Sequence, residues 1–249
     1  MNDVSQHSET VSWTAILAGV SIVIPAYDEE NGIELTLRSI RDVFRQAGFE
    51  NYEIVIIDDG SADSTAERAR SAGACIVRHP HNVGYGRSLK DGIVAAGYDT
   101  IVITDADGTY PVEQIPDLLQ QFVRGFDMVV GQRTGDHYRE SAIKAPLRHI
   151  LKFLVEYTAW RKIPDINSGL RVFSRATVLP YFQHLCDTFS FTTSLTLAYM
   201  MTGKFVAYVP IGYRQRIGKT KVRLLRESLR TLQYIVKAII YYNPLKIFL

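Results

Sequence analysis

Two aspartates in the stretch TDADGTYP, residues 104–111, have the type and spacing to bind a metal ion. Asp105 and Asp107 are separated only by Ala106 and follow the apolar run TIVI. In an extended segment, side chains at i and i+2 point to the same side, so the two negative charges should lie close together. The spacing therefore predicts a cation between them. The alternative is that the pair only caps a helix that opens at Pro111.

Alternating strands and helices must position this pair. Short apolar runs and helical spacing predict strands at 21–27, 52–60, 74–79, 99–105 and 126–133, and helices at 29–47, 61–73, 83–97 and 112–124. This order predicts an α/β fold with a mainly parallel sheet and helices on both faces. Acidic residues precede the early apolar run TAILAGVSIVIP, so that run is interpreted as a strand and not as a signal peptide.

Composition indicates one large folded domain. The chain has 249 residues, of which 47% are apolar and 22% charged, which suffices for a sizeable core. Its two cysteines lie far apart, which argues against a disulfide framework and favours a cytoplasmic location. No segment reaches the roughly 20 apolar residues of a membrane span.

Charge is distributed unevenly along the chain. From Arg214 onward, nine basic residues and one acid give +8, and because the whole chain carries +2, the first 213 residues carry −6. A basic C-terminal segment on an acidic body indicates an anionic partner such as a phosphate group or a membrane surface.

Four of the expected strands end in polar or turn residues, within PAYDEE, DDGSAD, TDADGTYP and GQRTGD. Ligands of open parallel sheets bind at the carboxyl ends of the strands, so these groups should converge. No GxGxxG follows the first strand, which argues against a Rossmann dehydrogenase.

Seven segments, in order, resemble the motifs of family-2 glycosyltransferases with a GT-A fold. They are IPAYDEE, VIIDDGSADST, NVGYGRSL, TDADGTYP, GQR, DINSGLRVF and RIGKTK, and they span roughly residues 20–223. The chain is most similar to the polyprenyl-phosphate sugar synthases, which act with dolichyl or undecaprenyl phosphate. The resemblance implies three parts: an N-terminal extension (1–19), a GT-A domain (20–223) and an amphipathic, membrane-proximal segment (224–249).

The resemblance implies that Asp105 and Asp107 hold Mg²⁺ or Mn²⁺ against the diphosphate of a nucleotide sugar, with Asp107 favoured as the direct ligand. A hard divalent ion suits carboxylate and phosphate oxygens. By the same resemblance, the nucleotide sugar is bound by Pro25, Ala26, Tyr27, Glu29, Asp58, Asp59, Arg87, Asp105, Ala106, Asp107, Arg216, Thr220 and Lys221.

Two of these motifs have plainer alternatives. One carboxylate of Asp58 and Asp59 is expected to accept a hydrogen bond from the base, but Asp59 or Ser61 could instead supply a turn and a helix cap. The segment RIGKTK is expected to fold over the diphosphate as a lid, and the alternative is a solvated basic turn.

The acceptor phosphate is expected to lie against Arg133, Lys144 and Arg148, because an Arg side chain presents a planar fork of donors. Lys144 and Arg148 are one helical turn apart, and this spacing equally fits an ordinary exposed helix face. The resemblance implies inversion at the sugar. A lipid phosphate is already largely dianionic at neutral pH, so it needs no general base. Asp165 is either a base or an anchor paired with Arg171. The expected catalytic residues are Asp107, Arg133 and Asp165.

The C-terminal segment is expected to be an amphipathic helix. Apolar residues recur at three- and four-residue spacing, and basic residues lie between them: Leu225, Leu229, Leu232, Val236 and Ile239, with Arg223, Arg226, Arg230 and Lys237. Such a helix can lie in an anionic interface or pack on the domain's own core.

The sequence thus predicts a metal-dependent, inverting transfer of a hexose from a UDP- or GDP-linked sugar to a polyprenyl phosphate. The protein is expected to be peripheral to the membrane or to be the soluble domain of a membrane-anchored enzyme. A sugar or protein hydroxyl acceptor, or a non-catalytic nucleotide-sugar-binding module, is the alternative. No nucleic-acid partner is expected, and the base, the sugar and the oligomeric state are left open.

Overall fold

The structure, a computed structural model, describes residues 13–135, 153–215, 224–242 and 244. The strands of its sheet are β1 Val20–Ala26, β2 Tyr52–Asp58, β3 Cys75–Arg78, β4 Thr100–Ile103, β5 Met128–Thr134, β6 Arg171–Ser174 and β7 Val206–Gly212. The helices are α1 Trp13–Ile16, α2 Ile33–Gln46, α3 Thr65–Ser71, α4 Tyr85–Ala95, η1 Val112–Gln114, α5 Ile115–Phe122, α7 Arg175–Val178, η4 Leu179–His184, α8 Phe191–Met201 and α9 Leu224–Tyr242. Residues 153–159 are also helical.

The seven strands form one sheet in the order β3-β2-β1-β4-β6-β5-β7. The pairs among β1, β2, β3 and β4, and the pair β5 and β7, are parallel, which confirms the predicted mainly parallel sheet. Strand β6 runs antiparallel to both of its neighbours. Neither β6 nor β7 was among the strands expected from the sequence.

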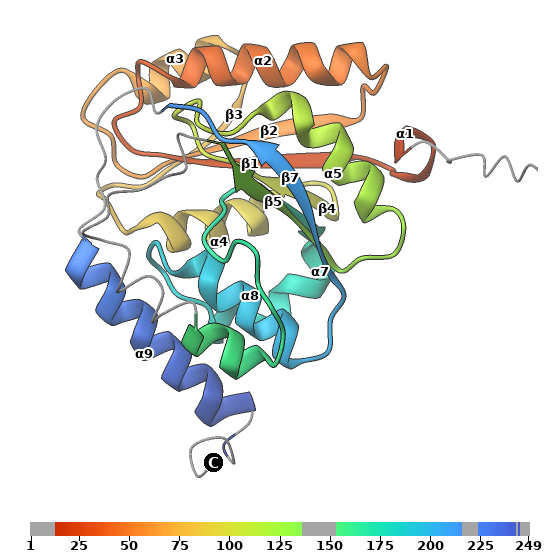
Figure 1. Cartoon of the computed structure of the whole chain (residues 1–249). Helices are drawn as coiled ribbons and strands as arrows, with labels where there is room; N and C mark the ends of the chain where they lie inside the picture. The colour runs from red at the N-terminus through yellow and green to blue at the C-terminus, as the bar shows by residue number, and fades with distance from the viewer. Residues whose placement is uncertain (1–12, 136–152, 216–223, 243, 245–249) are drawn as a thin grey trace, which may run out of the picture.

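Helices cover both faces of the sheet (Figure 1), as predicted. Alternate residues of β1 divide between two cores: Ile22 and Ile24 pack with α2 and α5, and Val23 packs with α4 and α8. A third cluster joins residues 153–159 to α8 and α9. In Figure 1 the chain enters β1 from α1 on the right, so the carboxyl ends of the parallel strands face left.

The beginnings of three elements differ from the prediction. Helix α2 begins at Ile33 rather than at residue 29. The residues before it form a loop in which the backbone N–H groups of Asp28 and Glu29 donate to Ser61 and Thr65. Helix α3 likewise begins at Thr65 and not at Ser61. The apolar run that begins at residue 14 was expected to be a strand, but its first residues belong to helix α1, Trp13–Ile16.

Helix α1 attaches the expected N-terminal extension to the domain. Its Trp13 is buried against Phe44 and Phe49, with ring centroids 5.9 and 4.8 Å away. The expected boundary at residue 20 coincides with the start of β1, although part of the preceding segment already belongs to the core.

Helix α9 has apolar residues on two sides. Ile235 is buried against the third cluster, together with Ala238 and Ile239, whereas Leu229 and Val236 are exposed. The helix therefore packs on the domain and still presents an apolar face outward. Within the described parts of the chain, no helix is both long and apolar enough to cross a membrane.

Candidate active site

The two aspartates lie in a turn just beyond β4. That strand ends at Ile103, and Gly108 has φ +72°, a left-handed conformation that glycine adopts without strain. The alternation argument for an extended pair therefore does not apply. Asp107 is 4% exposed, and its Oδ1 accepts hydrogen bonds from the backbone N and Oγ1 of Thr109, at 3.1 and 2.6 Å.

The start of α2 holds this turn from behind. The hydroxyl of Thr36 donates to the carbonyl of Ala106 at 3.1 Å, and a Cβ at Gly32 would lie 2.8 Å from the same oxygen. Because the obstructing atom is backbone, only glycine fits at position 32. The capping alternative for the aspartates is wrong in its predicted form, because no side chain caps η1, the helix that follows Pro111.

Asp105 is contacted from two further elements. The hydroxyl of Tyr85, the first residue of α4, donates to its Oδ1 at 3.0 Å. Gly169 lies against the same carboxylate, because a Cβ there would be 3.1 and 3.2 Å from its two oxygens. Tyr110 accepts a hydrogen bond from the Gly169 backbone N at 2.6 Å. Tyr85, Tyr110 and Gly169 all lie in the quoted motifs, but their residue types alone indicated no role.

The first two strand ends are tied to each other. Asp28 has φ +49°, and its Oδ1 accepts from the Ala62 N at 2.9 Å, while Glu30 N donates to Asp63 and Ser64 N donates to Glu30. The loops that follow β1 and β2 therefore form one structural unit, where the sequence placed the nucleoside.

Asp58 and Asp59 have different surroundings. Asp59 accepts from the backbone N of both Val83 and Gly84 at 2.9 Å, and it lies 2.8 Å from His79 Nδ1. The turn contact predicted for Asp59 or Ser61 is made instead by Asp58, whose Oδ1 accepts from the Ser61 N at 3.0 Å. The predicted helix cap at Asp59 or Ser61 is wrong, because α3 begins at Thr65, four residues after Ser61 at the end of the DDGS motif.

Asp165 meets Arg133, at the end of β5, in a two-point contact. Arg133 Nε lies 2.7 Å from Oδ2 and Nη2 lies 2.9 Å from Oδ1, and the Arg133 backbone N also donates to Oδ2. Burial works to raise the pKa of Asp165, but the hydrogen bonds and charge of Arg133 outweigh it, so that pKa is lowered.

The predicted partner of Asp165 was therefore wrong. Arg171 is fully buried, and its guanidinium donates to the carbonyls of Ser168 and Ile166 and to Thr196 Oγ1. Burial lowers the pKa of Arg171. The residue holds the loop before β6 by backbone contacts and not by pairing with a carboxylate.

Aromatic rings connect Arg133 with the aspartate turn. The Arg133 guanidinium lies 5.3 Å from the ring centroid of Tyr213, whose ring meets Tyr110 edge-on at 5.4 Å. Burial raises the pKa values of Tyr85, Tyr110 and Tyr213. At neutral pH these hydroxyls are therefore protonated.

The remaining predicted residues are only partly located. Pro25 and Ala26 end β1, next to Tyr27 and Glu29. Arg87 is on the exposed side of α4, and its Nε lies 2.7 Å from Asp91, one turn along the same helix. The other predicted residues, Lys144, Arg148, Arg216, Thr220 and Lys221, lie outside the described residues.

The aspartate turn fits a metal ion that is shared with a substrate. Among the described residues, no cluster of three or more His, Cys, Asp or Glu side chains could hold a metal ion. Mg²⁺ is typically bound by one or two carboxylates together with phosphate oxygens and water, rather than by a complete protein cage. Asp105 and Asp107, beside the loops expected to hold the nucleoside, match that kind of site.

The open, mainly parallel sheet with carboxylates at its carboxyl edge matches the GT-A fold expected from the sequence. The family model for glycosyl transferase family 2 matches residues 21–182, well over half of the chain. The protein belongs to glycosyl transferase family 2 and is a glycosyltransferase.

Two relatives in other organisms are named for lipid-phosphate acceptors. The dolichyl-phosphate hexose transferase of Haloferax volcanii is 28% identical over 212 residues, which cover 82% of this chain and 86% of that protein. The undecaprenyl-phosphate 4-deoxy-4-formamido-L-arabinose transferase of Pseudomonas fluorescens is 30% identical over 165 residues, 64% of this chain. The match spans 48% of the Pseudomonas protein.

A solved structure confirms the fold. The glucosyl-3-phosphoglycerate synthase of Mycobacterium tuberculosis, in complex with Mn²⁺, uridine diphosphate and glucosyl-3-phosphoglycerate, superimposes with a TM-score of 0.71. The alignment covers 91% of this chain and 81% of that one, at 22% sequence identity.

Proposed function

We propose that the chain transfers a hexose from a UDP- or GDP-linked sugar to a polyprenyl phosphate at a membrane surface, with inversion at the sugar. Asp105 and Asp107 hold Mg²⁺ or Mn²⁺ against the donor diphosphate. The names of the two lipid-phosphate relatives support the acceptor, and the family assignment supports the nucleotide sugar.

The contact between Arg133 and Asp165 favours a phosphate acceptor over an alcohol. An alcohol acceptor needs a base that removes its proton. Asp165, which the sequence offered as either a base or an anchor, is held in two-point contact by Arg133 and its pKa is lowered, so it is a weak base. The tyrosines whose pKa values are raised are protonated at neutral pH. A phosphate acceptor needs no such base.

The residues of the chain then bind and orient the reactants. A bound divalent ion would neutralise charge on the departing nucleoside diphosphate. Asp165 fixes the guanidinium of Arg133 through Nε and Nη2. We assign this oriented, planar cation to the acceptor phosphate. Tyr85, at the start of α4, and Gly169, in the loop before β6, both contact the carboxylate of Asp105 and fix its position. Catalysis on this scheme depends on positioning and charge.

Release of nucleoside diphosphate from UDP-glucose, UDP-GlcNAc and GDP-mannose tests the proposal, with Mg²⁺ or Mn²⁺ and with or without a short polyprenyl phosphate. We expect release from one donor only when the lipid phosphate is present, and loss of that release in Asp107→Ala. Asp117→Ala, which changes an exposed aspartate on α5, should behave like the wild type. Release with a soluble sugar acceptor instead, or none despite nucleotide binding, would contradict the proposal.

A further inference from the structure

Three aromatic side chains form an exposed ladder far from the aspartate turn. Phe153, Tyr157 and Trp160 are 66%, 40% and 75% exposed. Successive ring centroids are 6.3 and 6.4 Å apart, and the ring planes are tilted by only 21° and 26°. Spacing of four and three residues places the rings on one side of the helical residues 153–159. We call these three residues the aromatic ladder.

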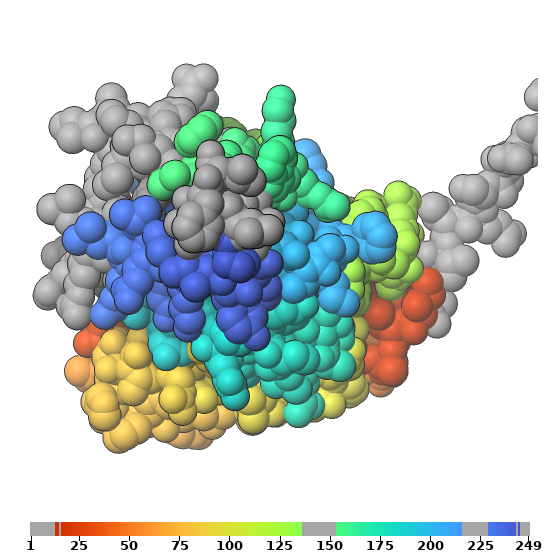
Figure 2. Space-filling model, turned by 90° about the horizontal axis from the view of Figure 1, so that it is seen from below, coloured from red at the N-terminus to blue at the C-terminus, as the bar shows by residue number. Residues whose placement is uncertain are grey.

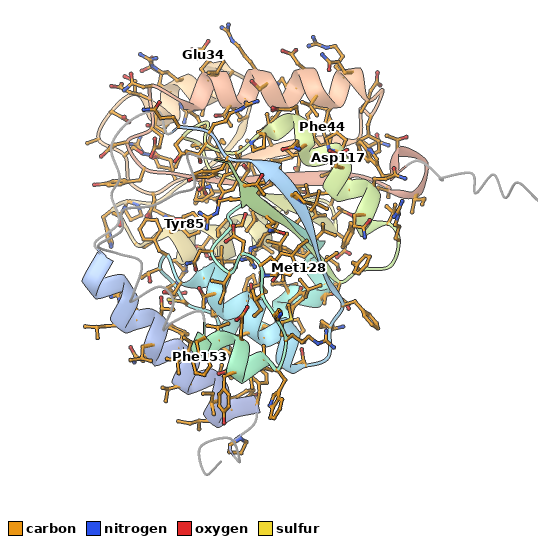
Figure 3. The ribbon with its side chains drawn as sticks, viewed as in Figure 1. Glu34, Phe44, Tyr85, Asp117, Met128 and Phe153 are labelled. Carbon is orange, nitrogen blue, oxygen red and sulfur yellow. The ribbon has the colours of Figure 1, made fainter. Side chains whose placement is uncertain are left out.

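The ladder is the outer side of a helix whose inner side is already packed. Val155 and Ala159 are buried in the third cluster, against Ile235 of α9. Figure 3 shows Phe153 at the lower end of the molecule beside α9, and Tyr85 on the opposite side of α8. The core therefore accounts for one face of residues 153–159 and leaves the aromatic ladder unexplained.

The backbone at Trp160 is a second observation. Trp160 has φ +54°, in the left-handed region where helices commonly end with glycine or asparagine. A bulky residue is a genuine outlier there, and such a conformation carries a cost in free energy. The indole is thus held at a position where a smaller residue would be more stable, which points to a role for the side chain itself.

Helix α9 continues the exposed apolar surface next to the ladder. Leu229, Leu232, Val236 and Ile240 are exposed on it, and Figure 2 shows α9 and the residues that follow 153 on the same face of the molecule. The charges in this region are basic.

Residues 153–162 and 229–242 carry Arg161, Lys162, Arg230 and Lys237. Their one acid is Glu156, whose carboxylate is turned to the Ile163 N at 2.8 Å.

We propose that the aromatic ladder and the exposed face of α9 together dock on the surface of an anionic lipid bilayer. Tyr and Trp favour the membrane interface, where the ring is apolar and the polar atom stays wet. Basic residues around them are attracted to anionic lipids. A second copy of this chain fits less well, because a two-fold interface would place the basic residues of one patch against those of the other. The inference rests on the proposed lipid acceptor for its choice of partner.

Tryptophan emission tests the docking directly, because the chain has only two tryptophans. Trp13 is buried, so Trp13→Phe leaves Trp160 as the sole reporter. Vesicles of phosphatidylcholine with one third phosphatidylglycerol, lacking any polyprenyl phosphate, should shift its emission to the blue. Brominated lipids should quench it. Pure phosphatidylcholine vesicles should produce a smaller shift.

Substitutions in the aromatic ladder test its contribution to vesicle binding separately from that of α9. Trp160→Asn suits the left-handed backbone and should not destabilise the fold, and Phe153→Gln keeps a helix-forming residue. Each should weaken co-sedimentation with the anionic vesicles about tenfold, in line with the loss of a buried apolar ring. Leu35→Gln, which removes an exposed apolar side chain from α2, is the matched control and should have no effect.

Two results would overturn the docking proposal. The first is that both ladder variants sediment with the vesicles as well as the wild type does and that the Trp160 emission does not shift. The second is a blue shift without vesicles that depends on protein concentration, which indicates a second copy. Transfer to a short, water-soluble polyprenyl phosphate is measured separately. If the unmutated chain does not bind the vesicles but performs that transfer, the docking surface alone is refuted. If it binds the vesicles but performs no transfer, the proposed function is refuted.

Discussion

The hydroxyl of Tyr85 donates a hydrogen bond to Oδ1 of Asp105 over 3.0 Å. The two residues belong to different elements. Tyr85 is the first residue of helix α4, and Asp105 lies just after strand β4. Burial, together with the charge of Asp105, raises the pKa of Tyr85 well above its usual value, so the hydroxyl stays protonated and remains a donor. This contact gives the first aspartate of the turn a defined orientation before any ligand arrives.

Tyr85→Phe should weaken binding of nucleoside diphosphate with Mn²⁺ severalfold and reduce the free energy of unfolding by about 1 kcal/mol, the usual net contribution of one hydrogen bond. Titration calorimetry and urea unfolding measure the two effects. Tyr208→Phe is the matched control, because the Tyr208 hydroxyl is buried with no hydrogen-bond partner in the described part of the chain. Equal nucleotide affinity in both variants would rule out an orienting role for Tyr85.

Asp165→Asn should reduce the free energy of unfolding at neutral pH by on the order of 3 kcal/mol, because Arg133 is left buried without its counter-charge. The exposed pair of Asp42 and Arg45 gives the comparison: Asp42→Asn should cost less than about 1 kcal/mol.

The contribution of Asp165 should also depend on pH. Its pKa is lowered in the folded protein, so the stabilisation is fully present above the ordinary carboxyl pKa of about 4 and is lost as the pH falls through the lower folded value. Thermal unfolding between pH 7 and pH 3 should show the difference between wild type and Asp165→Asn shrinking only below about pH 4. A constant difference over that range would contradict the assigned ion pair.

Gly169→Ala should reduce transferase activity about tenfold, which corresponds to ~1.4 kcal/mol, because the new methyl group displaces the carboxylate of Asp105. Circular dichroism should show that the fold is intact. Gly212→Ala is the control, since a Cβ at Gly212 meets no atom within 4 Å. Equal activity of the two variants would mean that the Asp105 carboxylate tolerates displacement.

Asp59→Asn should lower the free energy of unfolding by roughly 1–3 kcal/mol, because an amide cannot accept hydrogen bonds from both Val83 N and Gly84 N through its two ends. Thermal unfolding measures this effect. Asp117→Asn, which changes an exposed side chain on α5, is the control. If Asp59 serves only to contact the base, the melting temperature should not change and only nucleotide affinity should fall.

The order of strands and helices was readable from the sequence because it is a local property. The short apolar run 54–57 is buried on both faces of β2, and the apolar residues at three- and four-residue spacing in 33–46 are buried against one core, as the run and the periodicity predicted. The aspartates at 105 and 107 were placed correctly at the carboxyl edge of the sheet, since that edge follows from the parallel crossover rule.

Only the tertiary structure decided which side chains meet at that edge. Asp165 was expected beside Arg171, six residues away, but it bonds to Arg133, 32 residues away, because β6 returns antiparallel between β4 and β5. The bond from Tyr85 to Asp105, 20 residues apart, likewise depends on how α4 packs under the sheet. In α9, periodicity identified apolar residues but could not separate Ile235, which is buried, from Val236, which is exposed. Periodicity records which residues are apolar, whereas burial depends on the neighbours that the fold supplies.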